Sequence, residues 1–146
     1  MNDVNNEDLF PNNTSEEVLK DKLSPIFKEK GLRLIILFGS AVSGKINKNS
    51  DIDIAFLFDN PVDILELTNA VIRLLHTDNV DVVDLRRASP LLKFSAIKKG
   101  KPLYEREPGI FNEFSSLAFR MYIDTKKLRE AHAITISNFL KERGIA

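Results

Sequence analysis

The stretch that decides the fold spans residues 34–58 and reads LIILFGSAVSGKINKNSDIDIAFLF. An apolar run over residues 32–38 ends at Gly39-Ser40, and after ten further residues (41–50) a second apolar run begins at Asp51. Nearly continuous apolar runs of this length predict strands that are covered on both faces. The polar connection between them is rich in Asn, Lys and Ser, and it predicts a short helical turn followed by a loop.

The remaining elements follow from helical spacing, helix caps and chain breakers. We expect helices over residues 14–31, 62–76, 89–100 and 110–143, and strands over residues 80–85 and 103–104. The first helix should begin with a capping box, Thr14 to Glu17, and Pro25 should kink or interrupt it. Whether the last helix is continuous across residues 122–125 stays open at this stage.

The sum of these elements is an α/β (α+β) fold, with a small mixed β-sheet, flanking helices and a C-terminal helical tail. We expect residues 1–13 to be a flexible lead-in and residues 14–146 to form a single domain. Within this domain the core should cover about residues 32–104 and the helical tail about residues 110–143. The tail has apolar residues at helical spacing that should pack on the sheet, or dock a partner: Phe111, Phe114, Leu117, Ala118 and Met121.

Composition excludes several classes of protein. The chain has 146 residues, which is enough for one domain with a hydrophobic core of its own. It contains no Cys, which excludes disulfides, thiolate metal sites and a cysteine nucleophile. Its net charge is zero, so we expect no direct binding to nucleic acid. No apolar run has the length of a membrane span, and the acidic, Asn-rich start lacks the features of a signal peptide, so we expect a cytoplasmic protein.

One segment is strongly basic although the whole chain is neutral. Residues 85–104 contain no acidic residue and carry six cations: Arg86, Arg87, Lys93, Lys98, Lys99 and Lys101. A solvated helix face that balances acids elsewhere is one explanation. A surface that attracts a triphosphate or an acidic partner is the other.

The Asp51-Ile52-Asp53 sequence brings two carboxylates to one face of the second strand. On a regular strand they lie roughly 6.5–7 Å apart, close enough for their oxygens to converge on the same ions. Mg²⁺ is a hard cation that prefers oxygen ligands. Two such ions about 3.5–4 Å apart can bind the phosphates of a triphosphate and lower the pKa of an attacking hydroxyl. The pattern therefore indicates metal-assisted transfer of a nucleotide from ATP.

Two further features complete this pattern. A third carboxylate should come from the strand over residues 80–85, which offers Asp81 and Asp84. These two are three residues apart, so they point to opposite faces and only one can join the site. At the end of the first strand, Gly39 allows the backbone to approach a phosphate closely, and Ser40 adds a hydroxyl donor.

With these residues together, the sequence resembles the polymerase-beta-like nucleotidyltransferases, and within them the minimal nucleotidyltransferase (MNT) group. The resemblance spans about residues 32–104 and is carried by Gly39-Ser40, the ten-residue spacer, Ser50-Asp51-Ile52-Asp53 and Val80-Asp81-Val82-Val83. It implies a polymerase-beta-like nucleotidyltransferase core.

The resemblance also implies roles for individual residues. Asp51, Asp53 and Asp81 would be the catalytic carboxylates and metal ligands, with Asp84 as the second choice for the third position. Gly39 and Ser40 would bind the nucleotide. Members of the group often carry Arg at the positions of Ala41 and Ser43, and Lys45 or Lys48 would have to replace that phosphate contact.

The resemblance implies a partner as well as a reaction. In HEPN/MNT toxin–antitoxin pairs, the MNT protein transfers AMP from ATP to a tyrosine of the HEPN ribonuclease toxin. We therefore expect an antitoxin adenylyltransferase that uses ATP and two Mg²⁺ ions and forms a hetero-oligomeric complex with a HEPN-type toxin. Two alternatives stay open: a non-catalytic antitoxin that acts by binding, and a nucleotidyltransferase that modifies a small molecule such as an aminoglycoside.

Overall fold

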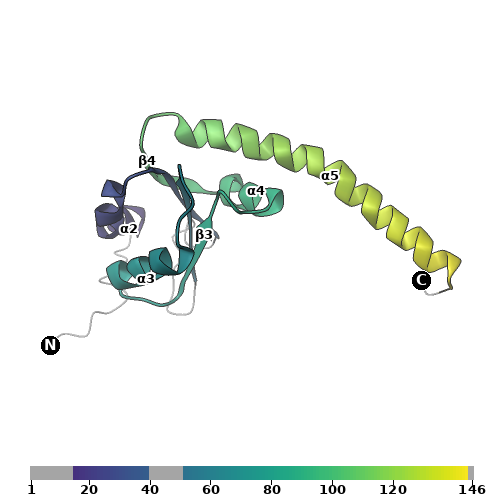
Figure 1. Cartoon of the computed structure of the whole chain (residues 1–146), viewed down its shortest axis with the longest axis horizontal. Coiled ribbons are helices and arrows are strands. Elements are labelled where there is room, and N and C mark those ends of the chain that lie inside the picture. The colour runs from purple at the N-terminus through teal and green to yellow at the C-terminus, as the bar shows by residue number, and fades with distance from the viewer. Residues whose placement is uncertain (1–14, 40–50, 145–146) are drawn as a thin grey trace.

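The computed structural model describes residues 15–39 and 51–144, which form a four-stranded sheet with helices on both faces (Figure 1). The elements in chain order are α2 (Ser15–Leu23), the 3₁₀ helix η1 (Ser24–Lys28), β1 (Leu32–Phe38), β2 (Ile52–Phe58), α3 (Ile64–Leu75), β3 (Val80–Asp84), α4 (Pro90–Lys98), β4 (Lys101–Glu105) and α5 (Ile110–Glu142). This confirms the expected fold class. The expected capping residue Thr14 and the polar connection over residues 40–50 lie outside the described residues.

The sheet is mixed, and its strand order is β3-β2-β1-β4. β1 pairs antiparallel with β2 on one side and with β4 on the other, whereas β3 runs parallel to β2. The parallel pair is joined by α3, because two parallel strands need a crossover connection. β1 and β2 are therefore the central strands, and both are almost completely buried, as their apolar runs predict.

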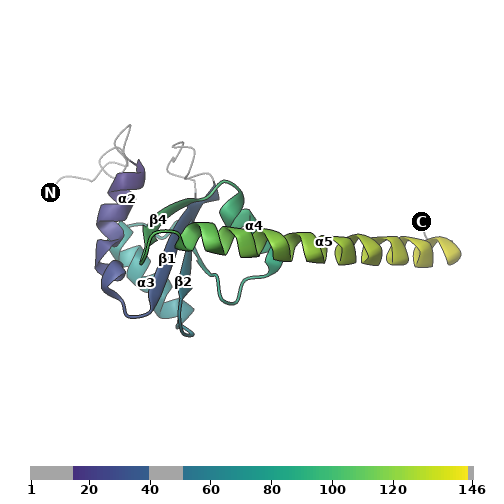
Figure 2. The ribbon, with the colours of Figure 1, turned by 90° about the horizontal axis from the view of Figure 1, so that it is seen from above.

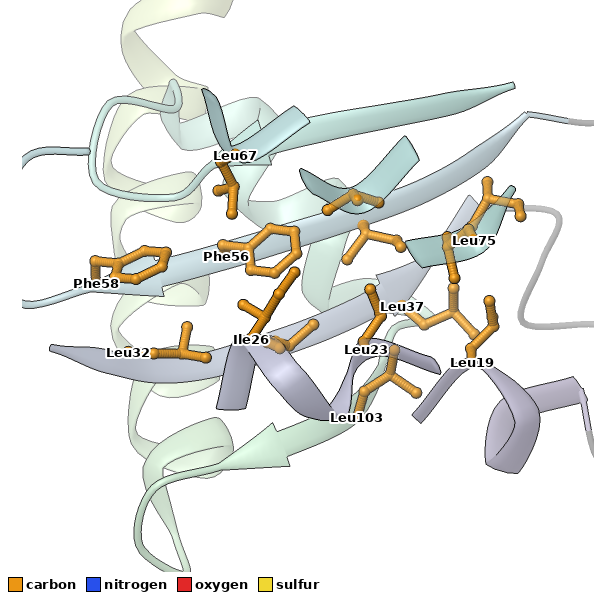
Figure 3. Close-up of a cluster of buried hydrophobic side chains, with 14 residues drawn as sticks. Leu19, Leu23, Ile26, Leu32, Leu37, Phe56, Phe58, Leu67, Leu75 and Leu103 are labelled. Atoms are coloured by element: carbon orange, nitrogen blue, oxygen red, sulfur yellow. The ribbon is translucent and has the colours of Figure 1, made fainter. Parts of the chain in front are cut away.

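One face of the sheet is covered by α2, η1 and α3. Figure 3 shows side chains from all of these elements meeting strand residues such as Leu37 and Phe56 in one apolar cluster. The chain folds back here because α2 ends at Leu23 and a 3₁₀ turn that contains Pro25 follows it, which confirms the expected interruption. Gly31, at a φ of +88°, turns the chain into β1.

The other face is covered by α4 and the first half of α5. Leu34, Ala55 and Leu57 of the central strands meet Ala96 of α4 and Ile110 of α5 in a second buried cluster. Ser89 caps α4, since its hydroxyl oxygen accepts a hydrogen bond from the Leu92 amide at 3.2 Å. The two helices thus cover the sheet face on which Asp53 lies, and α4 also lines part of the site described below.

The C-terminal helix α5 is a single continuous helix of 33 residues, so the break left open at residues 122–125 does not occur. Tyr122 stacks on Phe94 of α4 with 3.9 Å between ring centroids, and the Thr125 hydroxyl donates to the Met121 carbonyl oxygen at 3.0 Å. Both contacts support the helix where the sequence left it uncertain. Figures 1 and 2 show that the second half of α5 extends beyond the sheet.

Not every apolar residue expected to pack on the sheet does so. Phe111 and Phe114 are partly buried against the second cluster, and Ala118 is fully buried. Leu117 is 53% exposed, because it lies on the side of α5 that faces away from the sheet. In the described part of the chain, no helix is both long enough and apolar enough to cross a membrane.

The end of β2 is held by a cluster of arginines around Asp59. The Asp59 carboxylate accepts from Arg106 Nη1 at 2.6 Å and lies 3.5 Å from Arg33 Nε, and Arg86 donates to the Asp59 backbone carbonyl. The hydrogen bond from Arg106, together with the arginine charges, lowers the pKa of the Asp59 carboxyl. This cluster ties β1, β2 and β4 together at the end of the sheet opposite Asp53.

Candidate active site

The register of three adjacent strands determines the centre of the site. Phe38 of β1 lies opposite Asp53 of β2, and Asp53 in turn lies opposite Asp81 of β3. Residues paired across neighbouring strands point to the same face of a sheet, and neighbouring strands are about 4.8 Å apart. The structure therefore brings the Asp53 and Asp81 carboxylates side by side on the face that α4 and α5 cover.

Asp84 lies elsewhere, although it is on the same strand as Asp81. It pairs with Phe56, a residue of the opposite face, and its Oδ1 accepts a hydrogen bond from the Arg86 amide at 3.0 Å. Asp84 thus caps the turn after β3. The period of two along the strand separates the two aspartates, as the sequence predicts.

Asp51 lies just before β2, which begins at Ile52 rather than at Asp51. It is exposed, whereas Asp53 is half-buried. Partial burial raises the pKa of the Asp53 carboxyl, and repulsion from Asp81 and then from Asp51 raises it further. The three carboxylates therefore act on one another electrostatically, and they concentrate negative charge at one end of β2.

Gly39 lies directly against this cluster. Its φ of +71° is in the left-handed region, and a Cβ built at this position would lie 2.2 Å from Asp53 Oδ2. Only glycine lets the end of β1 pass so close to the carboxylate. The sequence predicts a role for Gly39 in phosphate approach but not this contact. Ser40, the other predicted nucleotide-binding residue, lies outside the described residues, as do Ala41, Ser43, Lys45 and Lys48.

The donor chemistry of this site fits Mg²⁺. The groups that share the face are carboxylates, which are the ligands that a hard cation prefers, and their mutual repulsion is what a bound cation would relieve. Within residues 15–39 and 51–144, no Lys or Arg forms an ion pair with Asp51, Asp53 or Asp81. No group of three or more His, Asp or Glu side chains in the same ranges is disposed to hold a metal as it stands, so binding would require their side chains to rotate.

A hollow of about 440 Å³ adjoins Asp81 and was not predicted from the sequence. Its lining includes Phe38, Ile64 and Leu92, which come from β1, α3 and α4. Residues so far apart in the chain give no common sequence signal. The one local hint is the Leu91-Leu92 pair in the first turn of α4, where two exposed apolar side chains adjoin a basic segment.

The model of the polymerase beta nucleotidyltransferase family matches residues 21–109 of the chain, a range that includes Gly39, Asp51, Asp53 and Asp81. The chain belongs to the polymerase beta nucleotidyltransferase family. The match confirms the resemblance that Gly39, Asp51, Asp53 and Asp81 indicate in the sequence.

Within this nucleotidyltransferase family, the chain is similar to proteins whose names refer to adenylyltransferases and to toxin–antitoxin complexes. The chain is 29% identical over 144 residues to the protein adenylyltransferase MntA of Aphanizomenon flos-aquae, a match that covers 90% of this chain and 96% of that protein. It is also similar to a chain in the crystal structure of a toxin–antitoxin with AMP-PNP, with 31% identity and a TM-score of 0.69 over 86% of this chain and 98% of the other. A third match is to the structure of a tri-AMPylated Shewanella oneidensis HEPN toxin in complex with MNT antitoxin, with 28% identity and a TM-score of 0.68 over 84% and 98% of the two chains.

Proposed function

We propose that this nucleotidyltransferase is an antitoxin that transfers AMP from ATP to a tyrosine hydroxyl of a HEPN-type toxin and thereby neutralises it. The observation that carries the proposal is the register that sets Asp53 beside Asp81, with Gly39 against Asp53. The similarity to a protein adenylyltransferase and to MNT antitoxin chains supports the protein acceptor. In this proposal residues 14–146 act as one domain in the cytoplasm, where ATP is available.

Each residue of the site has a distinct part in the proposal. Asp51, Asp53 and Asp81 would hold two Mg²⁺ ions, which would neutralise the phosphates of ATP and lower the pKa of the acceptor hydroxyl. Gly39 lets the backbone at the end of β1 approach the triphosphate. Ser40 would donate a hydrogen bond to a phosphate oxygen. The crowding of negative charge around Asp53 suits a site that works with cations bound.

The reaction itself needs positioning and charge stabilisation rather than a covalent enzyme intermediate. The tyrosine oxygen forms a bond to the α-phosphorus of ATP, and the bond from that phosphorus to the bridging oxygen breaks. Pyrophosphate leaves with the electron pair, and the phenol proton passes to water. Neither histidine lies on the strands that carry the carboxylates: His76 is the C-cap residue of α3 and His132 lies on α5.

The exposed surface of the second half of α5 favours a protein over a small molecule as the acceptor. The helix is about 50 Å long at the usual rise per residue, and its outer half extends beyond the sheet (Figure 2). This half exposes several large apolar side chains: Leu128, Ile134, Ile136 and Phe139. A surface of this kind fits a hetero-oligomeric complex better than a small-molecule acceptor.

The proposal is tested by the intact mass of the polypeptide encoded beside this gene, co-expressed with the wild type or with Asp53→Asn. We expect mass increments of one or more AMP units with the wild type and none with Asp53→Asn. Asp21→Asn is the matched control, because Asp21 is an exposed aspartate of α2, the helix that covers the other face of the sheet. An unmodified partner that co-purifies with both forms would instead favour an antitoxin that acts by binding alone, and modification of an aminoglycoside without any partner would favour a small-molecule acceptor.

A further inference from the structure

The hollow beside Asp81 combines an apolar lining with charged groups. Phe38 at the end of β1 is buried, whereas Ile64 and Leu92 are 37% and 36% exposed. Asp81, Asp84 and Arg87 supply charge to the same hollow. Its volume of about 440 Å³ lies within the range of pockets that bind small ligands or single side chains, and such pockets are mostly apolar with a few polar groups.

Arg87 is available to a ligand. Its backbone amide donates to the Asp84 carbonyl oxygen at 3.2 Å, which fixes the turn, but its side chain is exposed. In the part of the chain that the structure describes, its guanidinium forms no ion pair. A guanidinium is planar and stacks on aromatic rings, so it can bind an aromatic side chain as well as a charge.

The order of the strands places the hollow on one definite side of the carboxylates. Gly39 follows β1, Asp53 lies on β2, and Asp81 lies on the edge strand β3. If ATP lies with its phosphates against the β1 end, as the proposed function requires, the leaving pyrophosphate is on that side. The attacking and leaving oxygens of a phosphoryl transfer are roughly in line, so the acceptor must approach from the β3 side.

We propose that this hollow binds the side chain of the acceptor residue, with Leu92 and Ile64 against its aromatic ring and Arg87 stacked on the ring. The proposal rests on the proposed function and assigns a location to its acceptor. An apolar hollow of this kind selects a tyrosine over a serine or threonine, because an aliphatic hydroxyl residue is too small to cover its walls. The basic segment over residues 85–104 then contributes one specific cation to the site, Arg87.

The test compares neighbouring leucines of α4. Leu92 lines the hollow, whereas Leu91 is 53% exposed and does not line it. Initial rates of AMP transfer to the purified HEPN-type partner are measured with the acceptor varied at saturating ATP, and with ATP varied at saturating acceptor. We expect Leu92→Gln to raise the KM for the acceptor about ten-fold, which is the effect of losing one well-buried apolar contact, and to leave the KM for ATP within about two-fold of wild type. Leu91→Gln should leave both KM values within about two-fold.

Arg87 provides a second, independent variant. We expect Arg87→Gln to raise the KM for the acceptor, with partial rescue by Arg87→Lys, which keeps the charge but loses the planar group. Lys98→Gln, at an exposed cation of the same segment, is the charge control. Thermal unfolding of each variant shows whether the fold is retained.

The KM values distinguish a hollow that binds the acceptor from one that binds the adenine base. A raised KM for ATP in Leu92→Gln and Arg87→Gln would overturn the proposal, because the hollow would then bind the adenine base. Unchanged kinetics in both variants would also overturn it, while leaving the proposed function intact. Absence of transfer by the wild type would overturn the proposed function, and the role of the hollow with it.

Discussion

Replacing Gly39 with alanine tests how closely the backbone approaches the candidate carboxylate. The added Cβ would lie 2.2 Å from Asp53 Oδ2 and 3.1 Å from Asp53 Cγ, whereas ordinary van der Waals contact begins at 3.4 Å. The carboxylate must therefore move by more than about 1 Å, and since it is the end of a side chain, it rotates without moving the strand. A displacement of about 1 Å at a reacting group can lower the rate about 100-fold.

The same substitution should affect stability only modestly. A φ of +71° is unfavourable for alanine, and the left-handed conformation costs about 1–2 kcal/mol. We therefore expect Gly39→Ala to lose about 100-fold in the rate of AMP transfer, while its free energy of unfolding falls by only about 1–2 kcal/mol. The rate is measured with purified partner and ATP, and the stability by urea denaturation.

Gly31→Ala is the matched control for the cost of placing alanine in a left-handed backbone conformation. Gly31 has a φ of +88°, and a Cβ there would meet no atom closer than 3.8 Å. Both variants should lose similar stability, but only Gly39→Ala should lose activity. Transfer of AMP by Gly39→Ala at the wild-type rate, or a loss of activity in Gly31→Ala as large as in Gly39→Ala, would contradict a close approach of the backbone to Asp53.

Three further substitutions test contacts that stabilise the fold. Gly100→Ala should destabilise the protein by about 1–3 kcal/mol or more in urea denaturation, because its Cβ would lie 1.9 Å from the Ala96 carbonyl oxygen, a backbone atom; an unchanged midpoint would contradict this. Asp59→Asn should lower the melting temperature most near neutral pH, and the difference from wild type should shrink below about pH 4. This pH dependence follows because Arg106 lowers the pKa of Asp59 in the folded state. The stabilisation is therefore complete above the pKa of Asp59 in the unfolded chain and is lost as the pH falls through its pKa in the folded protein. A difference in melting temperature that grows in acid would contradict this. Ser115→Ala should raise the free energy of unfolding by about 1 kcal/mol, since the buried hydroxyl of Ser115 has no hydrogen-bond partner among the described residues, and a loss of stability would show that it has one.

The central strands and the spacing of the carboxylates could be predicted because both depend on local patterns. Continuous apolar runs predicted β1 and β2, and the period of two along a strand predicted that Asp81 and Asp84 face opposite ways. The choice between these two aspartates could not be made from the residue pattern alone, because it depends on which residues of β2 lie opposite them. The register supplies this information by pairing Asp81 with Asp53.

Features that depend on contacts between distant segments were not predictable in this way. The continuity of α5 depends on Tyr122 stacking on Phe94, a contact between two helices. The exposure of Leu117 depends on which side of α5 faces the sheet. The hollow beside Asp81 is formed by residues of four elements, β1, α3, β3 and α4, so no single stretch of sequence contains its pattern.

The most direct test of the central claim compares two aspartates of the same strand. The rate of AMP transfer at saturating ATP and saturating HEPN-type partner is measured for Asp81→Asn and Asp84→Asn, each alongside the wild type. Asp81 lies beside Asp53, whereas Asp84 caps the turn on the opposite face. We expect Asp81→Asn to lose transfer and Asp84→Asn to retain the rate at saturating partner, although Asp84 lines the hollow. Loss of transfer in Asp84→Asn with full activity in Asp81→Asn, or equal rates in both, would contradict it.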